Sequence, residues 1–591
     1  MENLKASLER LIGEALRRLH ANGLLGDLAQ APEATVSLCK DPTHGDFACT
    51  AAMSLARAAR RPPLEIARAL ATALPDDPLI ETVEVAGPGF LNFRLSSQAF
   101  QALVGTILSA PEQYGRSGDF EGRRIQVEFV SANPTGPLHV GHGRGAAYGA
   151  ALAELLAAVG WEVEREYYVN DAGRQMDILA ASVWLRCLER SGVTLSFPAN
   201  AYRGEYIRDI ANGLDASLRE RLVATAARPL LSLVAPEREP PLDTDEALDE
   251  LVAGLREAAG DPIWRTLSGA ALEVILSDIR EDLAEFGVHY DVWFSERNLV
   301  DGGAIERALT ALDANGESYR EGGALWFRAT RHGDEKDRVL VRENGQSTYF
   351  ASDIAYHSNK LERGFERLID VWGADHHGYI SRVKGALRGL GKDPDALAIL
   401  LVQFANLYRA GERVSMSTRS GEFVTLRELR EEVGNDAARF FYVMRKSDQH
   451  LDFDLDLAKT KSNENPVFYV QYAHARVASV LRQLREKGVE WRDEWALAHS
   501  VRLVEPHELT LLKSLSRFPD VVRTAARDYE PHQVAFYLRE VANDFHGYYN
   551  AHQFLVEDED LRNARVGLAR ATQVVVRNGL TLLGVSAPEA M

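Results

Sequence analysis

The part of the chain that most constrains its fold is a glycine- and proline-rich segment, residues 131–149 (SANPTGPLHVGHGRGAAYG). Before it, Arg124–Val130 carries an apolar residue at every second position, which predicts a strand. After it, Ala146–Val159 is rich in alanine and leucine and is followed by Gly160, which predicts a helix with a glycine end. Trp161–Val169 predicts a second strand. This order indicates a βαβ unit, in which the two strands are parallel.

The start of the predicted helix is suited to binding phosphate. A helix N-terminus offers unpaired N–H groups and a partial positive charge. Gly141, Gly143 and Gly145 allow a ligand to approach the backbone closely. His139 and His142 are three residues apart, so both can face one ligand and donate hydrogen bonds to phosphate oxygens as charge develops. Two ordinary polar loop histidines are the alternative, but the glycines beside them favour the phosphate site.

A dinucleotide-binding turn is a second interpretation of the same segment. Gly143 and Gly145 match the start of G-x-G-x-x-G, and Glu164 or Glu166 lies about 20 residues further, where a ribose-binding acid is expected. The third glycine, Gly149, comes one position late, and the glycines stand well beyond the predicted strand end. That motif requires a tight turn, so this interpretation ranks second.

The same residues resemble a known family. His139-Val140-Gly141-His142 is similar to the HIGH signature of class I aminoacyl-tRNA synthetases, and Val127–Pro137 (VEFVSANPTGP) resembles the arginyl enzymes of bacterial type. The resemblance implies an α/β multidomain protein with a Rossmann-like parallel-sheet catalytic domain, an α+β N-terminal domain that binds tRNA and an all-α anticodon-binding bundle. The expected boundaries are 1–118 for the N-terminal domain, 119–455 for the catalytic domain with a helical insertion around 190–265, and 456–591 for the bundle.

Composition narrows the class of protein. A chain of 591 residues is too long for one core, and a net charge of −19 argues against non-specific coating of nucleic acid. No apolar run is long enough to span a membrane, and the N-terminus lacks a signal-peptide pattern, so we expect a cytoplasmic protein. Cys39, Cys49 and Cys187 form no C-x-x-C motif, which predicts reduced thiols and no zinc site.

Periodicity predicts the elements of the N-terminal domain. Helices are expected at residues 4–19, 47–59 and 63–73, and strands at 82–85 and 90–95. From about Ser462 the pattern is helical to the end, with two segments rich in aromatic residues, 465–476 and 542–550. Core packing explains most of these rings, and the resemblance implies that a few stack on RNA bases.

Tyr349 and Asp353 are four residues apart at a predicted strand–helix junction and can line one pocket. The alternative is that Asp353 caps a helix beginning at Ile354. The resemblance implies that Tyr349 and Asp353 meet the guanidinium of arginine. It also implies that Glu128 and Asn133 help hold this substrate, with the two carboxylates, Glu128 and Asp353, facing the guanidinium.

Further along, Ile369–Trp372 predicts a buried strand that leads into Asp375 and His376. In open α/β sheets, ligands lie beyond such strand ends, and the resemblance places Asp375 and His376 near ATP. A metal site that includes His377 is the alternative, but adjacent histidines on an extended chain point apart.

Residues 413–421 occupy the place of the second family signature, K-M-S-K-S. Only Met416 and Ser417 match, because Ser415 and Thr418 replace the lysines. The candidate replacements for those lysines are Arg413 and Arg419.

Together, the resemblance implies a ligase that converts arginine and ATP, with Mg²⁺, to arginyl-adenylate and transfers the arginyl group to tRNA(Arg), acting as a monomer. The rival functions are a nicotinamide-dependent oxidoreductase and a non-catalytic RNA-binding protein.

Overall fold

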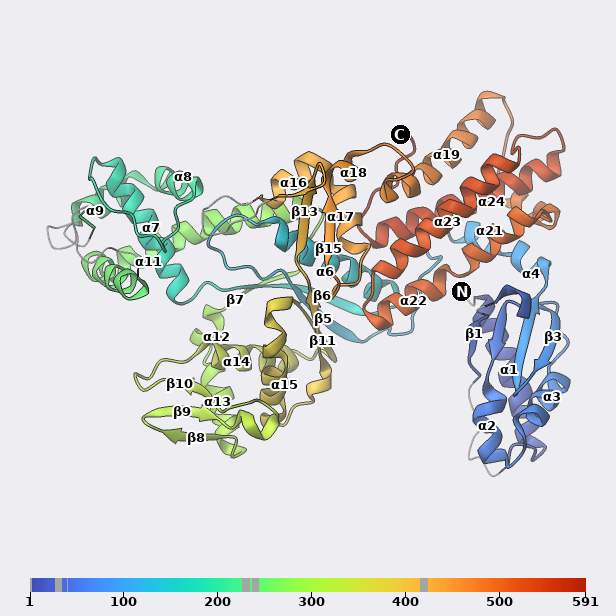
Figure 1. Cartoon of the computed structure of the whole chain (residues 1–591), viewed down its shortest axis with the longest axis horizontal. Helices are drawn as coiled ribbons and strands as arrows, with labels where there is room; N and C mark the ends of the chain where they lie inside the picture. The colour runs from blue at the N-terminus through green and yellow to red at the C-terminus, as the bar shows by residue number, and fades with distance from the viewer. Residues whose placement is uncertain (1–2, 27–33, 40, 226–233, 236–243, 415–423) are drawn as a thin grey trace. The chain divides into compact units, whose positions relative to one another are not determined.

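The computed structural model describes residues 3–26, 34–39, 41–225, 234–235, 244–414 and 424–591. The chain forms two compact units. One unit contains residues 1–118, 461–529 and 533–591, and the other contains residues 119–460 and 530–532. The N-terminal region and the C-terminal helices, which are far apart in the sequence, therefore belong to the same unit (Figure 1).

The larger unit is built on a parallel sheet with the strand order β12-β11-β5-β6-β7. Its strands are β5 (Arg124–Phe129), β6 (Glu162–Val169), β7 (Val292–Ser295), β11 (Arg367–Gly373) and β12 (Leu397–Val402). The chain runs outward from β5 to β7 and returns to place β11 on the other side of β5. Strand order therefore reverses between β5 and β11, and ligands of such sheets bind beyond the strand ends at this point. The predicted Rossmann-like parallel sheet is confirmed.

Helix α6 (Val140–Ala158) follows β5 and begins six residues earlier than predicted. His139-Val140-Gly141-His142 is consequently its first turn and not a preceding loop. The helix packs closely on β5, because a Cβ at Gly149 would lie only 2.3 Å from the Phe129 ring. Gly160, with φ of 101°, follows its last turn, so the glycine end is confirmed.

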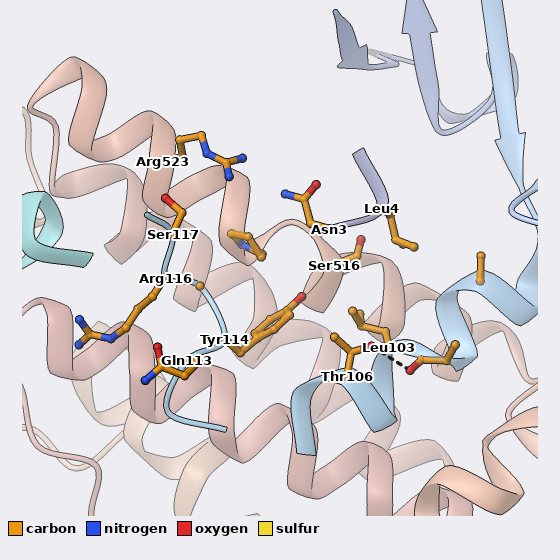
Figure 2. Close-up of a pocket in the computed structure, with 14 residues that line it drawn as sticks. Asn3, Leu4, Leu103, Thr106, Gln113, Tyr114, Arg116, Ser117, Ser516 and Arg523 are labelled. Carbon is orange, nitrogen blue, oxygen red and sulfur yellow. Dashed lines mark hydrogen bonds between the residues drawn. The ribbon is translucent and has the colours of Figure 1, made fainter. Parts of the chain in front are cut away.

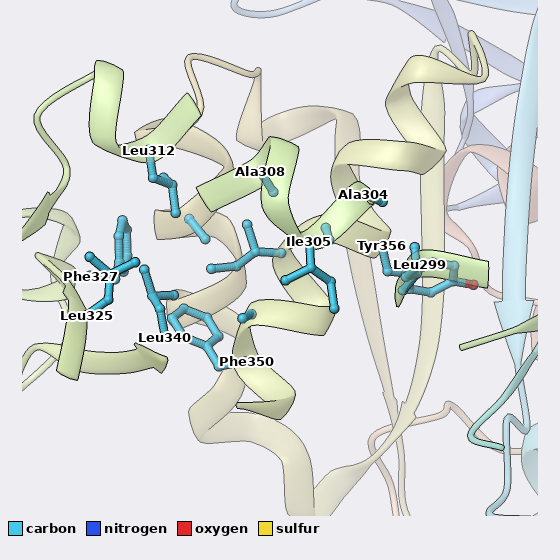
Figure 3. Close-up of a cluster of buried hydrophobic side chains, with 14 of the residues drawn as sticks. Leu299, Ala304, Ile305, Ala308, Leu312, Leu325, Phe327, Leu340, Phe350 and Tyr356 are labelled. Atoms are coloured by element: carbon cyan, nitrogen blue, oxygen red, sulfur yellow. The ribbon is translucent and has the colours of Figure 1, made fainter. Parts of the chain in front are cut away.

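A small subdomain supports the outer side of α14 (Tyr349–Glu362). It contains α12 (Arg297–Asp301), α13 (Ala304–Ala314), α15 (Ile380–Gly389) and the antiparallel strands β8 (Ser318–Glu321), β9 (Ala324–Phe327) and β10 (Arg338–Val341). Their buried side chains, among them Leu312, Phe327, Leu340 and Phe350, form one apolar cluster (Figure 3). This packing fixes the position of α14 from the side opposite the sheet.

The predicted insertion consists of helices that follow β6. These are α7 (Arg174–Arg190), α8 (Glu205–Gly213), α9 (Ala216–Thr225) and α11 (Asp245–Glu285). Helix α11 continues past residue 265, near which the insertion was predicted to end. Gly260, with φ of 71°, and Pro262 interrupt this helix close to that point. The unit is completed by β13 (Ala405–Arg409), β14 (Glu412–Arg413), β15 (Leu451–Asp454), α16 (Leu426–Val433), α17 (Asn435–Val443) and α18 (Leu455–Lys459).

In the described part of the N-terminal region, helices accompany a sheet of order β1-β2-β4-β3. Its elements are α1 (Leu4–Ala21), β1 (Val36–Leu38), β2 (Phe47–Cys49), α2 (Ala51–Ala59), α3 (Pro63–Ala73), β3 (Ile80–Ala86) and β4 (Phe90–Leu95). The predicted helix 47–59 is wrong at its start. Phe47 and Cys49 alternate into the core as strand β2, which pairs with β4, and the helix begins only at Ala51.

The C-terminal part is helical, as predicted. It contains α19 (Pro466–Glu486), α20 (Asp493–His499), α21 (Pro506–Ser516), α22 (Phe518–Asp528), α23 (His532–Ala551) and α24 (Glu559–Leu582). Next to α21 lie α4 (Ser97–Gln101) and α5 (Leu103–Ser109), and a pocket of about 110 Å³ opens there around Tyr114 (Figure 2). The Tyr114 hydroxyl donates to the Leu515 carbonyl at 2.9 Å. Among the described residues, no helix is long and apolar enough to cross a membrane.

Candidate active site

The two histidines of the first turn of α6 are fixed by the backbone. His139 is the N-cap, and its Nδ1 accepts a hydrogen bond from the Gly141 N–H at 3.1 Å. His142 Nδ1 accepts from the His139 N–H at 3.2 Å. Because each Nδ1 is an acceptor, the ring hydrogen of each imidazole is on Nε2. The two rings stack with centroids 3.8 Å apart, so both Nε2–H donors belong to one rigid pair.

Burial makes this pair electrically neutral. It lowers the pKa of His139, and it lowers the pKa of His142 to about 3, with the neighbouring His139 adding to the effect. Both imidazoles are therefore uncharged near pH 7. They can donate hydrogen bonds to a phosphate without first losing a proton or carrying a buried charge.

Packing explains two of the glycines next to these histidines. A Cβ at Gly143 would lie 2.8 Å from the side chain of Leu426, and a Cβ at Gly141 would lie 2.8 Å from the His139 ring and 3.2 Å from Phe404. At Gly145 a Cβ would have no neighbour within 4 Å. The small size of Gly141 and Gly143 is thus required by the protein itself, and close approach of a ligand to them stays a prediction.

Asp353 is not a helix cap. Helix α14 begins at Tyr349, and Thr348 caps it by accepting from the Ala351 N–H at 3.4 Å. Asp353 lies in the second turn, four residues after Tyr349, so the two side chains share one face of the helix. Tyr349 is 53% exposed, whereas Asp353 is half-buried and accepts a hydrogen bond from the Tyr379 hydroxyl on Oδ2. Burial raises the pKa of Asp353, and the bond from Tyr379 opposes this.

A second carboxylate, Glu296, lies beside Asp353 and was missed by the sequence analysis. Glu296 directly follows β7, is only 5% exposed, and its Oε2 has no hydrogen-bond partner among the described residues. Burial raises its pKa to about 7, against the hydrogen bonds from Ser352 and Tyr168, and the negative charge of Asp353 raises it further. Its position at the carboxyl end of a strand was the signal available in the sequence.

Glu128 and Asn133, the other predicted arginine contacts, lie at and just beyond the end of β5. Glu128 is buried, receives Lys360 Nζ on Oε2 at 2.5 Å and accepts from the Ser131 hydroxyl on Oε1 at 2.9 Å. Asn133 is exposed and accepts from Asn170 at 3.0 Å. Tyr168 on β6 lies near three of these carboxylates. Burial raises the pKa of its hydroxyl, and the negative charges of Glu296, Asp353 and Glu128 raise it further.

Asp375 and His376 lie at the end of β11, in the short helix η3 (Ala374–Tyr379). His376 Nε2 is 3.6 Å from Asp375 Oδ2, and the two side chains are 59% and 63% exposed. They lie just beyond the end of β11, the strand next to β5, at the reversal of strand order, where a nucleotide would be expected. Within the described ranges, no three His, Cys, Asp or Glu side chains are arranged to hold a metal ion.

Comparison with known proteins covers the whole chain. Residues 6–95 match the arginyl tRNA synthetase N terminal domain, residues 103–216 and 241–465 match the catalytic domain of tRNA synthetases class I (R), and residues 470–591 match the DALR anticodon binding domain. The chain is also 57% identical over 589 residues to the arginine–tRNA ligase of Thioalkalivibrio sulfidiphilus, with 100% of both chains covered. The chain belongs to the arginyl-tRNA synthetase family.

The chain is also similar to other members of the family in sequence and in structure. The arginine–tRNA ligase of Legionella pneumophila is 51% identical over 591 residues, with complete coverage of both chains. The solved structure of the Thermus thermophilus arginyl-tRNA synthetase superposes with a TM-score of 0.73 at 26% identity and covers 100% of each chain. The family reaction is the attachment of arginine to tRNA(Arg), and this chain is such a ligase.

Two of the predicted residues of this synthetase, Met416 and Ser417, lie outside the described residues.

The rival dinucleotide interpretation is wrong. Glu166, its proposed ribose ligand, is fully buried and bonded to Tyr356 at 2.5 Å and to Arg363 at 2.6 Å. Glu164, the other candidate, is paired with Arg363 at 3.1 Å.

Proposed function

We propose that the arginine side chain binds between Asp353 and Glu296. The observation that carries this proposal is the buried Oε2 of Glu296, which lacks a hydrogen-bond partner among the described residues, next to a second carboxylate. A buried polar group of this kind is costly unless a ligand satisfies it. The guanidinium of arginine stays protonated at any working pH and carries a planar fork of donors. It can therefore meet both carboxylates through charge-assisted hydrogen bonds.

The remaining predicted contacts complete the arginine site. Tyr349 shares the face of α14 with Asp353, and Asn133 is exposed at the corner after β5. Glu128 lies beneath this corner with its charge balanced by Lys360. We propose that Tyr349 and Asn133 hold the arginine alongside the two carboxylates, and that Glu128, whose charge Lys360 balances, acts on this site through the corner at Ser131. An uncharged amino acid would leave Asp353 and Glu296 unpaired, which supports selection of arginine without a separate editing step.

The proposed ATP site extends from the first turn of α6 to the end of β11. His139 and His142 would donate through Nε2 to the phosphate that receives arginine, where negative charge builds up in the transition state. The N-terminal turn of α6 that contains Gly141 and Gly143 adds its partial positive charge. Asp375 and His376 would border the nucleotide, with Mg²⁺ entering on the phosphates of ATP as part of that substrate. Met416 and Ser417 are assigned to the same site on the family signature alone.

The tRNA is proposed to bind through the N-terminal domain and the helical bundle. Within the bundle, the Arg476 guanidinium lies 4.6 Å from the ring centroids of both Tyr472 and Tyr549, an arrangement of cation and aromatic rings of the kind on which bases stack. Many other rings of the bundle are core residues, for example Phe545 and Tyr548. Cytoplasmic location is supported by three free cysteines, and the monomeric state stays a prediction from the family resemblance.

Arginine-dependent exchange between ATP and pyrophosphate, with and without tRNA, tests the proposed chemistry. Because Ser415 and Thr418 replace both signature lysines, we expect exchange to require tRNA. Robust exchange by the RNA-free enzyme would show that the phosphate site is complete without tRNA. No exchange with arginine, ATP and tRNA all present would contradict the activation step itself.

A further inference from the structure

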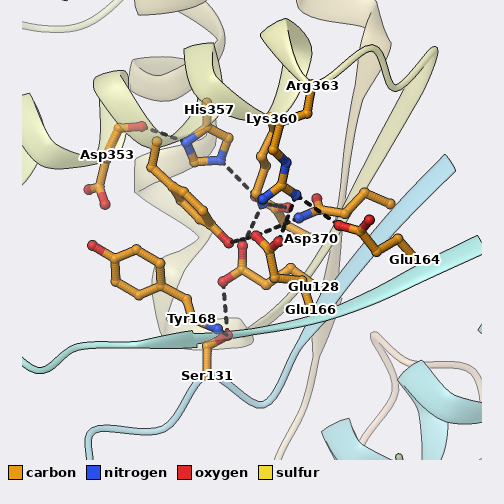
Figure 4. Close-up of polar contacts among 12 residues, drawn as sticks. Glu128, Ser131, Glu164, Glu166, Tyr168, Asp353, His357, Lys360, Arg363 and Asp370 are labelled. Carbon is orange, nitrogen blue, oxygen red and sulfur yellow. Dashed lines mark hydrogen bonds and ion pairs between the residues drawn. The ribbon is translucent and has the colours of Figure 1, made fainter. Parts of the chain in front are cut away.

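A buried network of charges lies on the face of α14 that packs against the sheet (Figure 4). Lys360, fully buried, places Nζ 2.5 Å from Glu128 Oε2 on β5 and 2.8 Å from Asp370 Oδ1 on β11. These two strands are the neighbours between which strand order reverses. One ammonium group therefore joins the two strands whose ends form the site.

His357, one turn earlier on the same helix, connects this network to Asp353. Its Nε2 is 2.7 Å from Asp370 Oδ2, and its Nδ1 is 2.7 Å from the Asp353 backbone carbonyl. A carboxylate and a carbonyl are both acceptors, so both ring nitrogens must donate and the imidazole is protonated. Burial acts to lower the pKa of His357, and Asp370 more than offsets this, so its pKa is raised.

The charges of the network balance one another. Lys360 and His357 contribute two positive charges, and Glu128 and Asp370 contribute two negative charges. The network consequently has no charge to offer a ligand. The unbalanced carboxylates beside it are Asp353 and Glu296.

The network also supports a strained corner. Val130 and Ser131, directly after β5, have φ of 67° and 40°, a left-handed conformation that is a clear outlier for β-branched valine. The Ser131 hydroxyl donates to Glu128 Oε1 at 2.9 Å and accepts from the Tyr168 N–H at 3.0 Å. The strained corner is thus held by the same carboxylate that Lys360 holds, and it leads directly to Asn133 and the histidine pair.

From this connectivity we infer that Lys360 is a positioning residue for arginine activation. Its ammonium sets the distance between α14, which carries Asp353, and the β5 corner, which carries Asn133 and leads to His139. It does not touch the substrate. The inference rests on the proposed arginine site at Asp353. A role in folding alone would not require an ion pair here, because buried ion pairs can often be replaced by apolar residues without loss of stability.

The test compares Lys360→Arg with Arg363→Lys. Both exchanges keep the positive charge of a residue on or at the end of α14 that pairs with two acids, but Arg363 binds Glu164 and Glu166 on β6 and neither Glu128 nor Asp370. In Lys360→Arg the larger planar guanidinium must displace Glu128 or Asp370. A displacement of about 1 Å at a site can reduce activity by about 10²-fold. We therefore expect kcat/KM for arginine to fall by a factor of that order, with KM for ATP nearly unchanged, whereas Arg363→Lys keeps both close to the wild-type values.

Thermal unfolding of each purified variant establishes that the assays are made on folded protein. If folded Lys360→Arg uses arginine like the wild type, or if Arg363→Lys loses as much, the positioning role is wrong. Should Lys360→Arg not fold, Lys360→Met combined with Asp370→Leu and Glu128→Gln removes the Lys360 ammonium together with the two carboxylates that it pairs with, and is measured in the same way. Normal arginine use by that triple variant would also overturn the inference. Asp353→Asn serves as the reference: if it too leaves arginine use unchanged, the arginine site itself is misplaced.

Discussion

Two ends of one face of α14 place negative charge in different surroundings. Asp353, His357 and Lys360 are spaced by four and three residues, so they lie on the same side of the helix. Toward the C-terminal end of the helix, Lys360 and His357 are paired with Glu128 and Asp370 at 2.5–2.8 Å. In the second turn, Asp353 accepts a side-chain hydrogen bond from the neutral Tyr379, and Glu296 lies beside it with one oxygen that has no hydrogen-bond partner among the described residues. Carboxylates occur at both ends, but among the described residues a cation pairs with them only at the C-terminal end.

This difference separates a structural cluster from a binding site. Burial alone does not mark function, since the fully buried Asp370 belongs to the balanced network. A carboxylate that is costly to ionise in the free protein becomes favourable when a cationic ligand arrives. Removing the charge of Asp353 or Glu296 is therefore expected to impair arginine use, whereas for the pairs made by Lys360 their geometry is expected to matter.

The largest expected effect follows from removing the charge of Asp353. Asp353→Asn keeps the shape of the side chain but leaves the substrate cation under-compensated. Disrupting a buried charge pair costs about 2–5 kcal/mol, which corresponds to roughly 30-fold to several thousand-fold in kcat/KM for arginine. Steady-state kinetics should show this loss while KM for ATP barely changes. Glu362→Gln, at the other end of α14, is the control, and normal arginine use by Asp353→Asn would remove Asp353 from the site.

The histidine pair differs from these carboxylates, because burial keeps both imidazoles neutral instead of charged. His142→Ala should lower kcat by roughly 10²–10³, the effect of losing one preorganised donor, with little change in KM. His142 also accepts from the His139 N–H, so alanine weakens the helix start as well. His142→Gln preserves that cap, since glutamine is a regular partner in such capping boxes. Full activity of His142→Gln would mean that capping is the only role of His142.

A smaller effect is expected from the titration of Glu296. With a pKa of about 7, its ionised fraction rises as the pH increases from 6 to 8, and only the ionised form balances the arginine cation. We expect kcat/KM for arginine to rise by about tenfold over this interval, since two pH units centred on the pKa change the ionised fraction by that factor. In Glu296→Gln the rise should disappear. An identical pH profile for variant and wild type would exclude Glu296 as the titrating group.

Sequence patterns identified much of the fold, because strand alternation, helix periodicity and glycine ends are local properties. The parallel sheet, the helical C-terminal part and the bounds of α3 and β4 were found in this way. Phe47–Cys49 was misassigned because its partner strand, β4, lies more than forty residues away. The start of α6 was also placed too late, because the capping by His139 and His142 depends on the folded turn.

The site was predictable only in part for a similar reason. The spacing of Tyr349 and Asp353 is visible in the sequence, but whether an acid has a cationic partner depends on contacts between distant segments. Glu128 and Lys360 are 232 residues apart. Glu296 carries no motif, and its unpartnered oxygen becomes apparent only when β7, α14 and β6 are brought together.

The smallest expected effect concerns the stability of the protein without substrate. Glu296 has a pKa raised from 4.5 to about 7, so between these values it is protonated in the folded protein and ionised in the unfolded chain. The stability that its protonated form provides is fully present below pH 4.5 and is lost as the pH rises to about 7. At pH 8, Glu296→Gln should therefore increase the free energy of unfolding by about 1–3 kcal/mol, and at pH 4 the difference should nearly vanish.

Denaturant unfolding of the protein at both pH values, with the catalytic unit monitored by hydrogen exchange, measures the difference in unfolding free energy between wild type and Glu296→Gln. Saturating arginine provides the second half of the measurement, because a ligand stabilises the folded state in proportion to its affinity. At pH 8, arginine should stabilise the wild type more than Glu296→Gln and so reduce or reverse the advantage of the variant. If the wild type is the more stable protein at pH 8 without arginine, Glu296 has a satisfied structural role, and the contrast between the two ends of α14 would then rest on Asp353 alone.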